Sequence, residues 1–394
     1  MTSWKKDRKI LLCITGGIAA YKIPSLVRLV RKSYSEVEII LTKSAKNFVA
    51  PMALETLSGR KVWTDDDFDG QIPHIRLSQW ADVLVVAPCT ANTIAKIAHG
   101  MADNLLTSTV IASGRPVLIF PAMNEKMFGN PATQSNIETL KARGFRVVQP
   151  SSGSLACGDS GKGRMPEPDE ILHEILRALC VQDMAGKKVL VTAGPTHEYI
   201  DPVRYISNPS TGKMGSAMAR SAWYRGADVR IIVGPVQVDS WGMEQIHVTS
   251  ANEMMSAVIS NLPWADYIVK AAAVGDYRAK EISGLKIKRE GKDSLTLELV
   301  SNPDIAAQAG KLKRDSQVLI GFAAETDRIS ENAKSKLLRK NLDFILANDV
   351  TEKDSGFASD TNTLRLISSS GSEEFFSGLK EEISFDVWSR IIAD

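Results

Sequence analysis

The stretch KILLCITGGIAAYK (residues 9–22) decides the fold class of the first half of the chain. It begins with an apolar run, turns at the pair Gly16 and Gly17, and continues into a segment with helical spacing. A short apolar run bounded by turn residues is typical of a buried strand, and a helix directly after it is typical of a parallel sheet. The stretch therefore predicts the first strand–turn–helix unit of an α/β domain.

The same pattern recurs along the chain, with helical segments such as YKIPSLVRLVRK (21–32) and NTIAKIAHGMADNLLTSTVIA (92–112) in between. Such alternation predicts two doubly wound domains, Rossmann-like or flavodoxin-like, each with helices on both faces of its sheet and ligands at the carboxyl ends of the strands. The further predicted strands are EIILTKSA (38–45), ADVLVVAP (81–88), PVLIFPAM (116–123) and RVVQP (146–150), then KKVLVTAGPT (187–196), ADVRIIVGP (227–235), ADYIVKAAAV (265–274), QVLIGFAAE (317–325) and DFILANDV (343–350).

A length of 394 residues favours two domains, because single hydrophobic cores stop growing below that size. DEILHEILRALC (169–180) is typical of a closing helix, and the polar QDMAGKK (182–188) follows it. We expect one domain over residues 1–183 and a second over 184–394. The second is predicted to end with two short strands and a helix.

The balance of 48 basic and 46 acidic residues excludes a strongly charged surface for nucleic acid or membrane and favours small-molecule chemistry. The first apolar run is short and is broken by glycine, unlike a signal peptide or a membrane span. The cysteines are scattered, with no CxxC pair for zinc. We therefore expect a cytoplasmic protein, with Cys13 and Cys180 as core residues.

Two motifs after predicted strands point to a cofactor. The glycine pair lets the backbone approach a phosphate at a helix start, although a plain tight turn explains it equally well. After the strand that ends at Pro88, polar side chains gather where a ligand would lie, but Thr90 or Asn92 could instead cap the next helix.

Three scattered residues are candidates for catalysis. His74 in QIPHIRL and Asn124 in PAMNEKMF could also have ordinary structural roles, in a core, a turn or a cap. Cys157 lies in the glycine-rich SLACGDSGKGRMPEP, where Lys162 and Arg164 favour its thiolate or an anionic substrate. The alternative is a fortuitous exposed thiol.

With GGIAAYK, PHIRL, APCTANTIAKIAHGMADNLL, PAMNEKM and ACGDSGKGRMPEP in this order, the first half resembles the homo-oligomeric flavin-containing cysteine decarboxylases. Together with the second half, the chain is similar to the bifunctional phosphopantothenoylcysteine decarboxylase/phosphopantothenate–cysteine ligases over nearly its whole length. The resemblance implies that FMN oxidises the carbon bearing sulfur before CO2 leaves. His74 would be the base, Asn124 would bind the carboxylate and Cys157 would return a proton. The FMN-binding residues would be Gly16, Gly17, Thr42, Pro88, Thr90, Asn92 and Thr93.

The second half carries two motifs suited to a nucleotide. SNPSTGKMG (207–215) places Ser210, Thr211, Gly212 and Gly215 at a predicted helix start, a phosphate nest or simply a capped helix, and it is not a Walker A loop. In KAAAVGDYRAKEISGLKIKRE (270–290) an acidic residue precedes a basic cluster. That order suits a metal–triphosphate complex or a solvated basic loop.

In the resembling ligases, CTP activates the carboxylate of 4′-phosphopantothenate as an acyl cytidylate, and the amine of cysteine then displaces CMP with the help of Mg²⁺. The resemblance gives Asn208 a part in handling the acyl cytidylate, Lys286 a part in forming it, and Asp276 the metal. The remaining nucleotide-binding positions are Lys270, Ala271, Ala272, Asn302, Pro303, Asp304, Ile305, Phe322, Lys336 and Lys340, with Asp276 and Lys286 also in this set.

The chain departs from the family pattern at Phe128, where tryptophan is common, at His197, where arginine is usual, and at Arg289, where lysine is usual. The family assembles trimers of its flavin domains within dodecamers and dimers of its ligase domains, with FMN expected at a subunit interface. A flavin prenyltransferase, a stand-alone peptidyl-cysteine decarboxylase and a flavin-binding regulatory subunit of protein phosphatases are alternatives. The second domain counts against the two enzymes, and intact His74, Asn124 and Cys157 count against the regulator.

Overall fold

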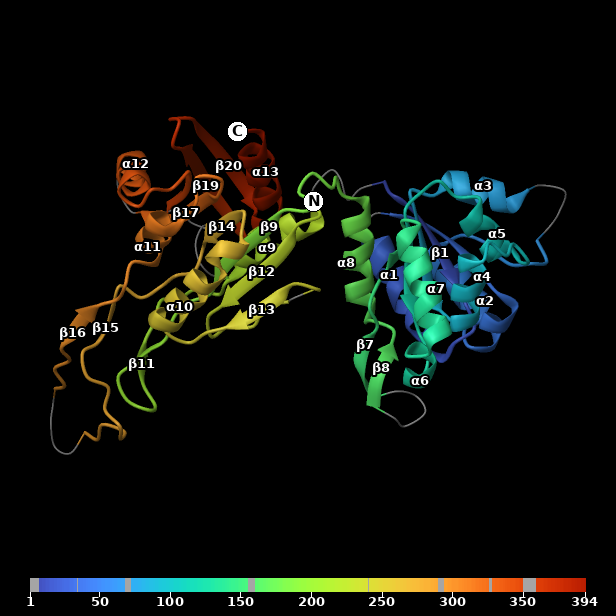
Figure 1. The fold of residues 1–394 in the computed structure, drawn as a ribbon, viewed down its shortest axis with the longest axis horizontal. Coiled ribbons are helices and arrows are strands. Elements are labelled where there is room, and N and C mark those ends of the chain that lie inside the picture. Colours follow the sequence, from blue (N-terminus) through green and yellow to red (C-terminus); the bar gives the residue numbers. More distant parts are fainter. Residues whose placement is uncertain are drawn as a thin grey trace. The chain divides into compact units, whose positions relative to one another are not determined.

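The structure, a computed structural model, describes residues 7–33, 35–67, 72–154, 160–239, 241–289, 294–325, 328–349 and 359–394. These residues form two units, one ending at Cys180 and the other beginning at Val181, each with its own central sheet (Figure 1). In the described part of the chain, every helix is too short or too polar to cross a membrane.

A six-stranded parallel sheet with the order β3-β2-β1-β4-β5-β6 forms the centre of the first unit. From β1 the chain moves outward to one side and then returns to build the other side. This reversal opens a crevice at the carboxyl ends of the strands next to β1. The strands are β1 (Lys9–Ile14), β2 (Glu36–Leu41), β3 (Val62–Trp63), β4 (Val83–Cys89), β5 (Val117–Pro121) and β6 (Arg146–Val147).

Helices cover both faces of this sheet, so strand β1 is apolar and buried from Ile10 onward: Ile10, Leu12 and Ile14 enter one core, and Leu11 and Cys13 enter the other. The first core is closed by α1, α2 and α8, and the second by α3, α4, α5 and α7. The helices are η2 (Ile18–Lys22), α1 (Ile23–Lys32), η3 (Lys43–Asn47), α2 (Pro51–Ser58), α3 (Pro73–Trp80), α4 (Ala91–Ala98), α5 (Leu105–Ile111), α6 (Glu125–Phe128), α7 (Pro131–Ala142) and α8 (Pro168–Leu179), and a hairpin of β7 (Ser151–Ser154) and β8 (Ser160–Arg164) precedes α8.

One helical pattern, residues 92–112, forms two helices rather than one. Gly100 adopts φ +71°, a left-handed conformation that favours glycine and ends α4. Asn104 then caps α5 by accepting a hydrogen bond from the Thr107 amide. The helical spacing of apolar residues continues across this break because both helices pack on the same core.

An eight-stranded sheet forms the centre of the second unit, in the order β13-β12-β9-β14-β17-β18-β19-β20. It is parallel up to β18 and antiparallel beyond it. The predicted doubly wound class is therefore confirmed, with an antiparallel extension. The strands are β9 (Lys188–Ala193), β12 (Asp228–Val233), β13 (Glu244–His247), β14 (Tyr267–Lys270), β17 (Val318–Glu325), β18 (Phe344–Asp349), β19 (Thr361–Ser368) and β20 (Glu373–Leu379).

Two small antiparallel pairs, which periodicity did not reveal, extend from this unit, and its helices again lie on both faces (Figure 1). The pairs are β10 (Glu198–Tyr199) with β11 (Tyr205–Ile206), and β15 (Tyr277–Ala279) with β16 (Leu299–Ser301). The helices are α9 (Lys213–Tyr224), α10 (Ala251–Asn261), η4 (Leu262–Trp264), α11 (Ile305–Leu312), α12 (Ile329–Arg339) and α13 (Lys380–Ala393).

Helix α13, the last helix of the second unit, packs against α9. Trp388 is fully buried, its Nε1 donates a hydrogen bond to the Met218 carbonyl over 2.9 Å, and its ring meets Tyr267 edge-on at 5.5 Å. A single aromatic side chain thus joins the last helix to α9 and to the central sheet.

We expect Trp388→Ala to lower the free energy of unfolding of the second unit by about 3–5 kcal/mol, because the cavity cannot close fully around the missing ring. Denaturant unfolding followed by circular dichroism measures the change. Phe375→Ala is the control, since Phe375 is 66% exposed. Equal effects of the two substitutions would contradict this account of α13.

Candidate active sites

The turns after β1 and β4 are joined at the carboxyl edge of the first sheet. Thr15 Oγ1 donates a hydrogen bond to the Pro88 carbonyl over 2.7 Å, and the Thr90 amide donates to Thr15 Oγ1 over 3.2 Å. The peptide bond between Ala87 and Pro88 is cis. The two predicted cofactor motifs therefore lie side by side at the point where the strand order reverses.

The glycine pair fits this edge for two different reasons. A Cβ atom on Gly16 would lie 2.4 Å from Ser44 Cβ, so glycine is required there by the close approach of the turn after β2. A Cβ on Gly17 would instead face Thr90 Cγ2 and Pro88 Cγ at 3.8 and 4.0 Å. The missing side chain leaves space between the two turns for a ligand group such as a phosphate.

Other predicted cofactor residues surround the same edge. The Thr42 amide and hydroxyl both donate to the Ile14 carbonyl, over 3.1 and 3.2 Å. Thr90 Oγ1 accepts from the Thr93 amide and so caps α4, the structural role that sequence alone left open. Asn92 is exposed in the first turn of α4. These residues therefore lie together at the carboxyl edge of the sheet. The presence of threonine at position 90 is explained in part by its role as the cap of α4.

His74 is the second residue of α3. The helix ends just before β4, at the amino edge of the sheet, where Asp82 is hydrogen-bonded to Lys9. The helix runs back along the sheet, so His74 lies toward the carboxyl edge. Its Nδ1 atom is buried, and within the described residues it has no hydrogen-bond partner. A buried imidazole nitrogen without a partner is costly in a purely structural role.

Asn124 follows β5 and caps α6, since its Oδ1 accepts from the Lys126 amide over 2.8 Å. The β7–β8 hairpin lies against this turn: the Met123 amide donates to the Gly163 carbonyl over 3.0 Å, and a Cβ on Gly163 would come within 2.2 Å of the Met123 carbonyl oxygen. Cys157, between the two strands of the hairpin, lies outside the described residues.

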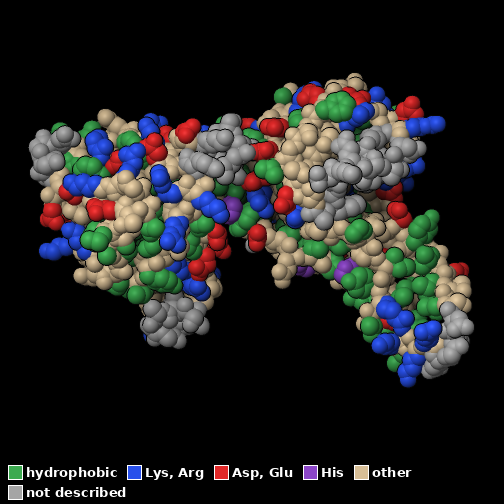
Figure 2. All heavy atoms as spheres, turned by 180° about the vertical axis from the view of Figure 1, so that it is seen from behind, with side chains coloured by type: hydrophobic (Ala, Val, Ile, Leu, Met, Phe, Trp, Pro, Cys, Tyr) green, Lys and Arg blue, Asp and Glu red, His purple; other side chains and the backbone are tan. Residues whose placement is uncertain are grey.

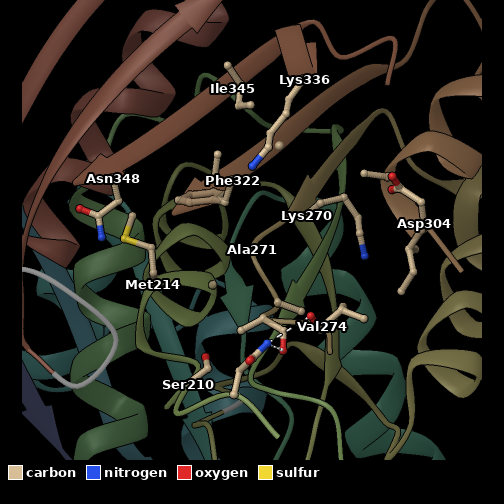
Figure 3. A pocket seen from close by; sticks show the side chains of 18 of the residues that line it. Ser210, Met214, Lys270, Ala271, Val274, Asp304, Phe322, Lys336, Ile345 and Asn348 are labelled. Carbon is tan, nitrogen blue, oxygen red and sulfur yellow. Dashed lines mark hydrogen bonds between the residues drawn. The ribbon is translucent and has the colours of Figure 1, made fainter. Parts of the chain in front are cut away.

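The second unit contains a cavity of about 520 Å³ at the carboxyl edge of its sheet (Figure 3). The segment between β11 and α9, the start of α9, the turn after β14, the start of α11, the middle of β17 and helix α12 all contribute to its wall. The predicted nucleotide residues that line it are Lys270, Ala271, Ala272, Asp276, Asn302, Pro303, Asp304, Ile305, Phe322, Lys336 and Lys340.

Lysines give this cavity its charge. Lys270, at the end of β14, is buried, its Nζ donates to Thr192 Oγ1 over 3.4 Å, and burial lowers its pKa to about 7. Lys340 pairs with Asp304 at 3.0 Å. Burial by itself would raise the pKa of Asp304, but hydrogen bonds from the Ala307 amide and Lys340 lower it overall. Figure 3 shows the Lys336 side chain directed into the same space.

Asparagines hold the turns on the opposite wall. Asn208 Nδ2 donates to the carbonyls of Ala273 and Val274, over 3.3 and 3.2 Å. Asn302 Nδ2 donates to the Gly275 carbonyl over 2.8 Å, and the Asn302 amide donates to the Asp276 carbonyl. Asp276 itself is exposed. In the described parts of the chain, no group of three or more His, Cys, Asp or Glu side chains could hold a metal by itself.

Lys286 does not lie among the residues that line the cavity, and its side chain is exposed. The next residue is fixed instead, because the Ile287 amide donates to the buried carboxylate of Asp201 over 3.2 Å. Sequence reasoning missed several lining residues, among them Lys213, Met214, Asn348, Asn362 and Lys380. Lys213 and Met214, inside the predicted nest motif, carried a signal in the sequence. The others come from strands and a helix whose approach to the nest depends on tertiary packing.

The two departures from the family pattern that concern side-chain packing have local consequences. Phe128 packs against the core that α3, α4, α5 and α7 close, so the smaller ring is accommodated in apolar surroundings. His197 stacks on Tyr205, with ring centroids 3.7 Å apart, and burial lowers the pKa of its imidazole. A neutral ring therefore occupies the position where arginine is usual.

Comparisons with known proteins agree with the division of the chain into two units. Residues 2–180 match the family described as Flavoprotein, and residues 184–393 match the DNA/pantothenate metabolism flavoprotein C-terminal domain. Three similar relatives are each named Coenzyme A biosynthesis bifunctional protein CoaBC. The Vibrio parahaemolyticus protein is 41% identical over 98% of this chain and 98% of its own, the Haemophilus influenzae protein 43% over 98% and 97%, and the Bacillus subtilis protein 42% over 98% and 97%.

These relatives are matched across both units, so the similarity is not that of one shared domain. The resemblance that the motifs indicated is thereby confirmed. This chain belongs to the family of coenzyme A biosynthesis bifunctional proteins, with a flavoprotein domain followed by a pantothenate-metabolism domain.

Proposed function

We propose that the chain catalyses two consecutive reactions of coenzyme A biosynthesis. Residues 184–394 join cysteine to 4′-phosphopantothenate with CTP, and residues 1–183 then decarboxylate the product to 4′-phosphopantetheine with FMN. The observation that carries this proposal is the cavity of the second unit, because it gathers the expected nucleotide residues from distant segments of the chain. The names of the full-length relatives support the pairing of the two reactions.

In the ligation, a carboxylate must be activated before an amine can replace its oxygen. CTP would supply the activating cytidylyl group, and Lys270, Lys336 and Lys340 would offset the charge of its phosphates. Asn208 would hold the acyl cytidylate beside the turn after β14. Lys286 would act from the exposed loop that Asp201 anchors, which requires this loop to move toward the cavity.

We assign Mg²⁺ to the triphosphate, with Asp276 as its protein ligand. Mg²⁺ keeps several waters and is commonly held by one or two carboxylates together with substrate phosphates. A single carboxylate at the cavity wall is compatible with such a site, whereas a site made entirely of protein ligands would need more of them. The phosphates of CTP together with water would therefore supply the remaining ligands of the metal.

The substrate 4′-phosphopantothenate has a second anionic group, its phosphate. Lys213 and Lys380 also line the cavity, and Lys380 is buried with its pKa lowered by burial and by the nearby charge of Lys213. Ser210 and Gly212 lie beside them at the start of α9. We assign the substrate phosphate to this group, because Lys380, Lys213 and a helix start favour an anion, and Lys213, which pairs with Asp360 at 2.6 Å, would exchange that partner for the phosphate.

For decarboxylation, FMN would bind where the turns after β1, β2 and β4 meet, and when bound it supplies the electron sink that loss of CO2 requires. His74 is available to move a proton, since its Nδ1 is buried without a partner in the described residues. The α6 cap fixes the side chain of Asn124, whose amide nitrogen can donate to the departing carboxylate. Cys157 would return a proton to the product.

We further propose a homo-oligomer, with trimers of flavin domains within a dodecamer, dimers of ligase domains and FMN at a subunit interface. Tyr21, Met52 and Met127 are exposed on the first unit, and Figure 2 shows hydrophobic side chains among charged ones on its surface, which is compatible with an assembly through that unit. The buried free thiols of Cys13, Cys89 and Cys180 are compatible with the reducing cytoplasm to which we assign the protein.

The proposed function is tested by supplying CTP, 4′-phosphopantothenate and cysteine to purified protein. We expect a yellow protein with a flavin spectrum that releases CMP and CO2 in equal amounts, because each ligated molecule is then decarboxylated. Chromatography of nucleotides and trapping of labelled CO2 measure the two products. Colourless protein that makes no CMP would refute the assignment, and yellow protein that makes neither product would favour a regulatory flavoprotein.

We expect Cys157→Ser to keep bound FMN and CMP formation but to lose the final protonation, because serine is a far weaker acid than a thiol. The variant should release CO2 without forming 4′-phosphopantetheine, which mass spectrometry of the products detects. Cys180→Ala, which removes a buried thiol at the end of α8, is the matched control. Undiminished 4′-phosphopantetheine formation by Cys157→Ser would show that this thiol is not the proton donor.

Nucleotide binding should depend on pH through Lys270. Its pKa of about 7 in the free protein rises when an anion binds, so CTP affinity should be highest below pH 7 and should fall by up to about tenfold per pH unit above it. Calorimetry at pH 8 in buffers of different ionisation enthalpy should detect proton uptake. Lys270→Met should abolish this uptake, and Lys311→Met, outside the cavity, should retain it. Equal proton uptake by all three proteins would exclude Lys270 as its source.

A further inference from the structure

A buried carboxylate in the first unit has no part in the reactions proposed above. Glu38 lies in β2 and is only 4% exposed. Its neighbours Val37 and Ile39 enter the core on one face of the sheet, so Glu38 faces the other, where Leu77 of α3 packs. A carboxylate in such surroundings is expensive to bury unless hydrogen bonds and charges satisfy it.

Three donors from different segments satisfy Glu38. Trp63 Nε1 donates over 2.7 Å, Arg76 Nη2 over 3.0 Å and Arg60 Nη1 over 3.2 Å. Arg76 belongs to α3, while Arg60 and Trp63 lie before and in β3. The carboxylate therefore joins helix α3 to the edge of the central sheet.

Aromatic contacts hold the same helix at a second point. The Arg76 guanidinium lies 4.5 Å from the Trp63 ring centroid, and the Arg60 guanidinium lies 5.6 Å from that of Trp80, which is also in α3. Residues 76 and 80 are four apart and so share one face of the helix. Both contacts, together with the Glu38 hydrogen bonds, oppose rotation of α3 about its axis.

Helix α3 carries His74 two residues before Arg76. Successive residues of a helix are turned by about 100°, so any rotation that moves Arg76 moves the imidazole through the same angle. Replacing a buried ion pair by apolar residues is often neutral or stabilising, so stability alone is a weak reason for this cluster. A better reason for the cluster is that it fixes the position of His74, the group proposed to transfer the proton.

We propose that Glu38 is a positioning residue for decarboxylation, which acts through Arg76 to fix helix α3 and thereby the direction of His74. This inference rests on the proposed role of His74 as the base. Glu38 itself contacts neither substrate nor cofactor in this proposal. Its contribution is to keep the imidazole within reach of the proton that His74 moves, since small misplacements of a reacting group are costly to rate.

The test is Glu38→Gln in the full-length protein with FMN bound. We expect kcat for decarboxylation to fall about tenfold with little change in KM, because the imidazole is displaced while substrate contacts remain. CMP formation by the second unit, measured in the same preparation, should stay within about twofold of the unchanged protein. Arg76→Met should give the same loss, and the double variant should lose no more than either one.

A second measurement needs no activity. In flavin-free protein, modification of His74 by diethylpyrocarbonate, followed by mass spectrometry, should be about threefold faster in Glu38→Gln because α3 opens more often. Glu36→Gln is the matched control: Glu36 pairs with the same Arg60 at 2.6 Å, but it lies at the exposed rim and has no hydrogen bond to Arg76 or Trp63 in the described residues.

Each outcome decides between the possibilities. Unchanged kcat in Glu38→Gln, unchanged His74 modification, or equal losses in Glu36→Gln would overturn the inference. If Glu38→Gln loses both its bound FMN and its ability to form CMP, the inference is also overturned, since losing both would indicate general destabilisation. If the unchanged protein releases no CO2, the proposed function fails instead, and the His74 modification still reports whether Glu38 holds α3.

Discussion

The rest of this structure depends on one constraint. In each sheet a central strand pairs in parallel with two neighbours, and the chain builds the sheet first on one side of that strand and then on the other. In the first sheet that strand is β1, between β2 and β4, and in the second it is β9, between β12 and β14. Because every parallel strand delivers its following turn to the same edge, segments far apart in sequence meet beside β1 and β9. Both candidate sites lie at these points.

The two units use this shared plan for different chemistry. At the first edge, the contacts between the turns after β1 and β4 are made by backbone groups and by the hydroxyl of Thr15. At the second, lysines from β14 and α12 and the asparagines of the surrounding turns line a cationic cavity. The difference arises from the turns and helices, since the parallel order around β1 and β9 is the same.

Buried charged groups connect the sites to the scaffold. Lys22, at the end of the short helix η2 that follows the glycine pair, is 6% exposed and donates to the Met165 carbonyl and to Glu167 at the start of α8, which lowers the pKa of that carboxyl. The helix after the glycine pair is thus joined to the chain that follows the β7–β8 hairpin. Asp201 has a comparable role in the second unit, where it accepts amide hydrogen bonds from Val203, Arg204 and Ile287.

The sequence by itself determined the fold class, the ten principal parallel strands that were predicted and the family, because continuous apolar runs between turn residues can only be buried inside a covered parallel sheet. It also named most of the residues that line the second cavity, through motifs whose chemistry is local. Tertiary structure alone decided the break between α4 and α5, the contribution of Lys380 and Asn362, and the distance of Lys286 from the cavity. It alone revealed the Glu38 cluster. These features depend on side chains that meet across different elements, and no periodicity along one segment records such a meeting.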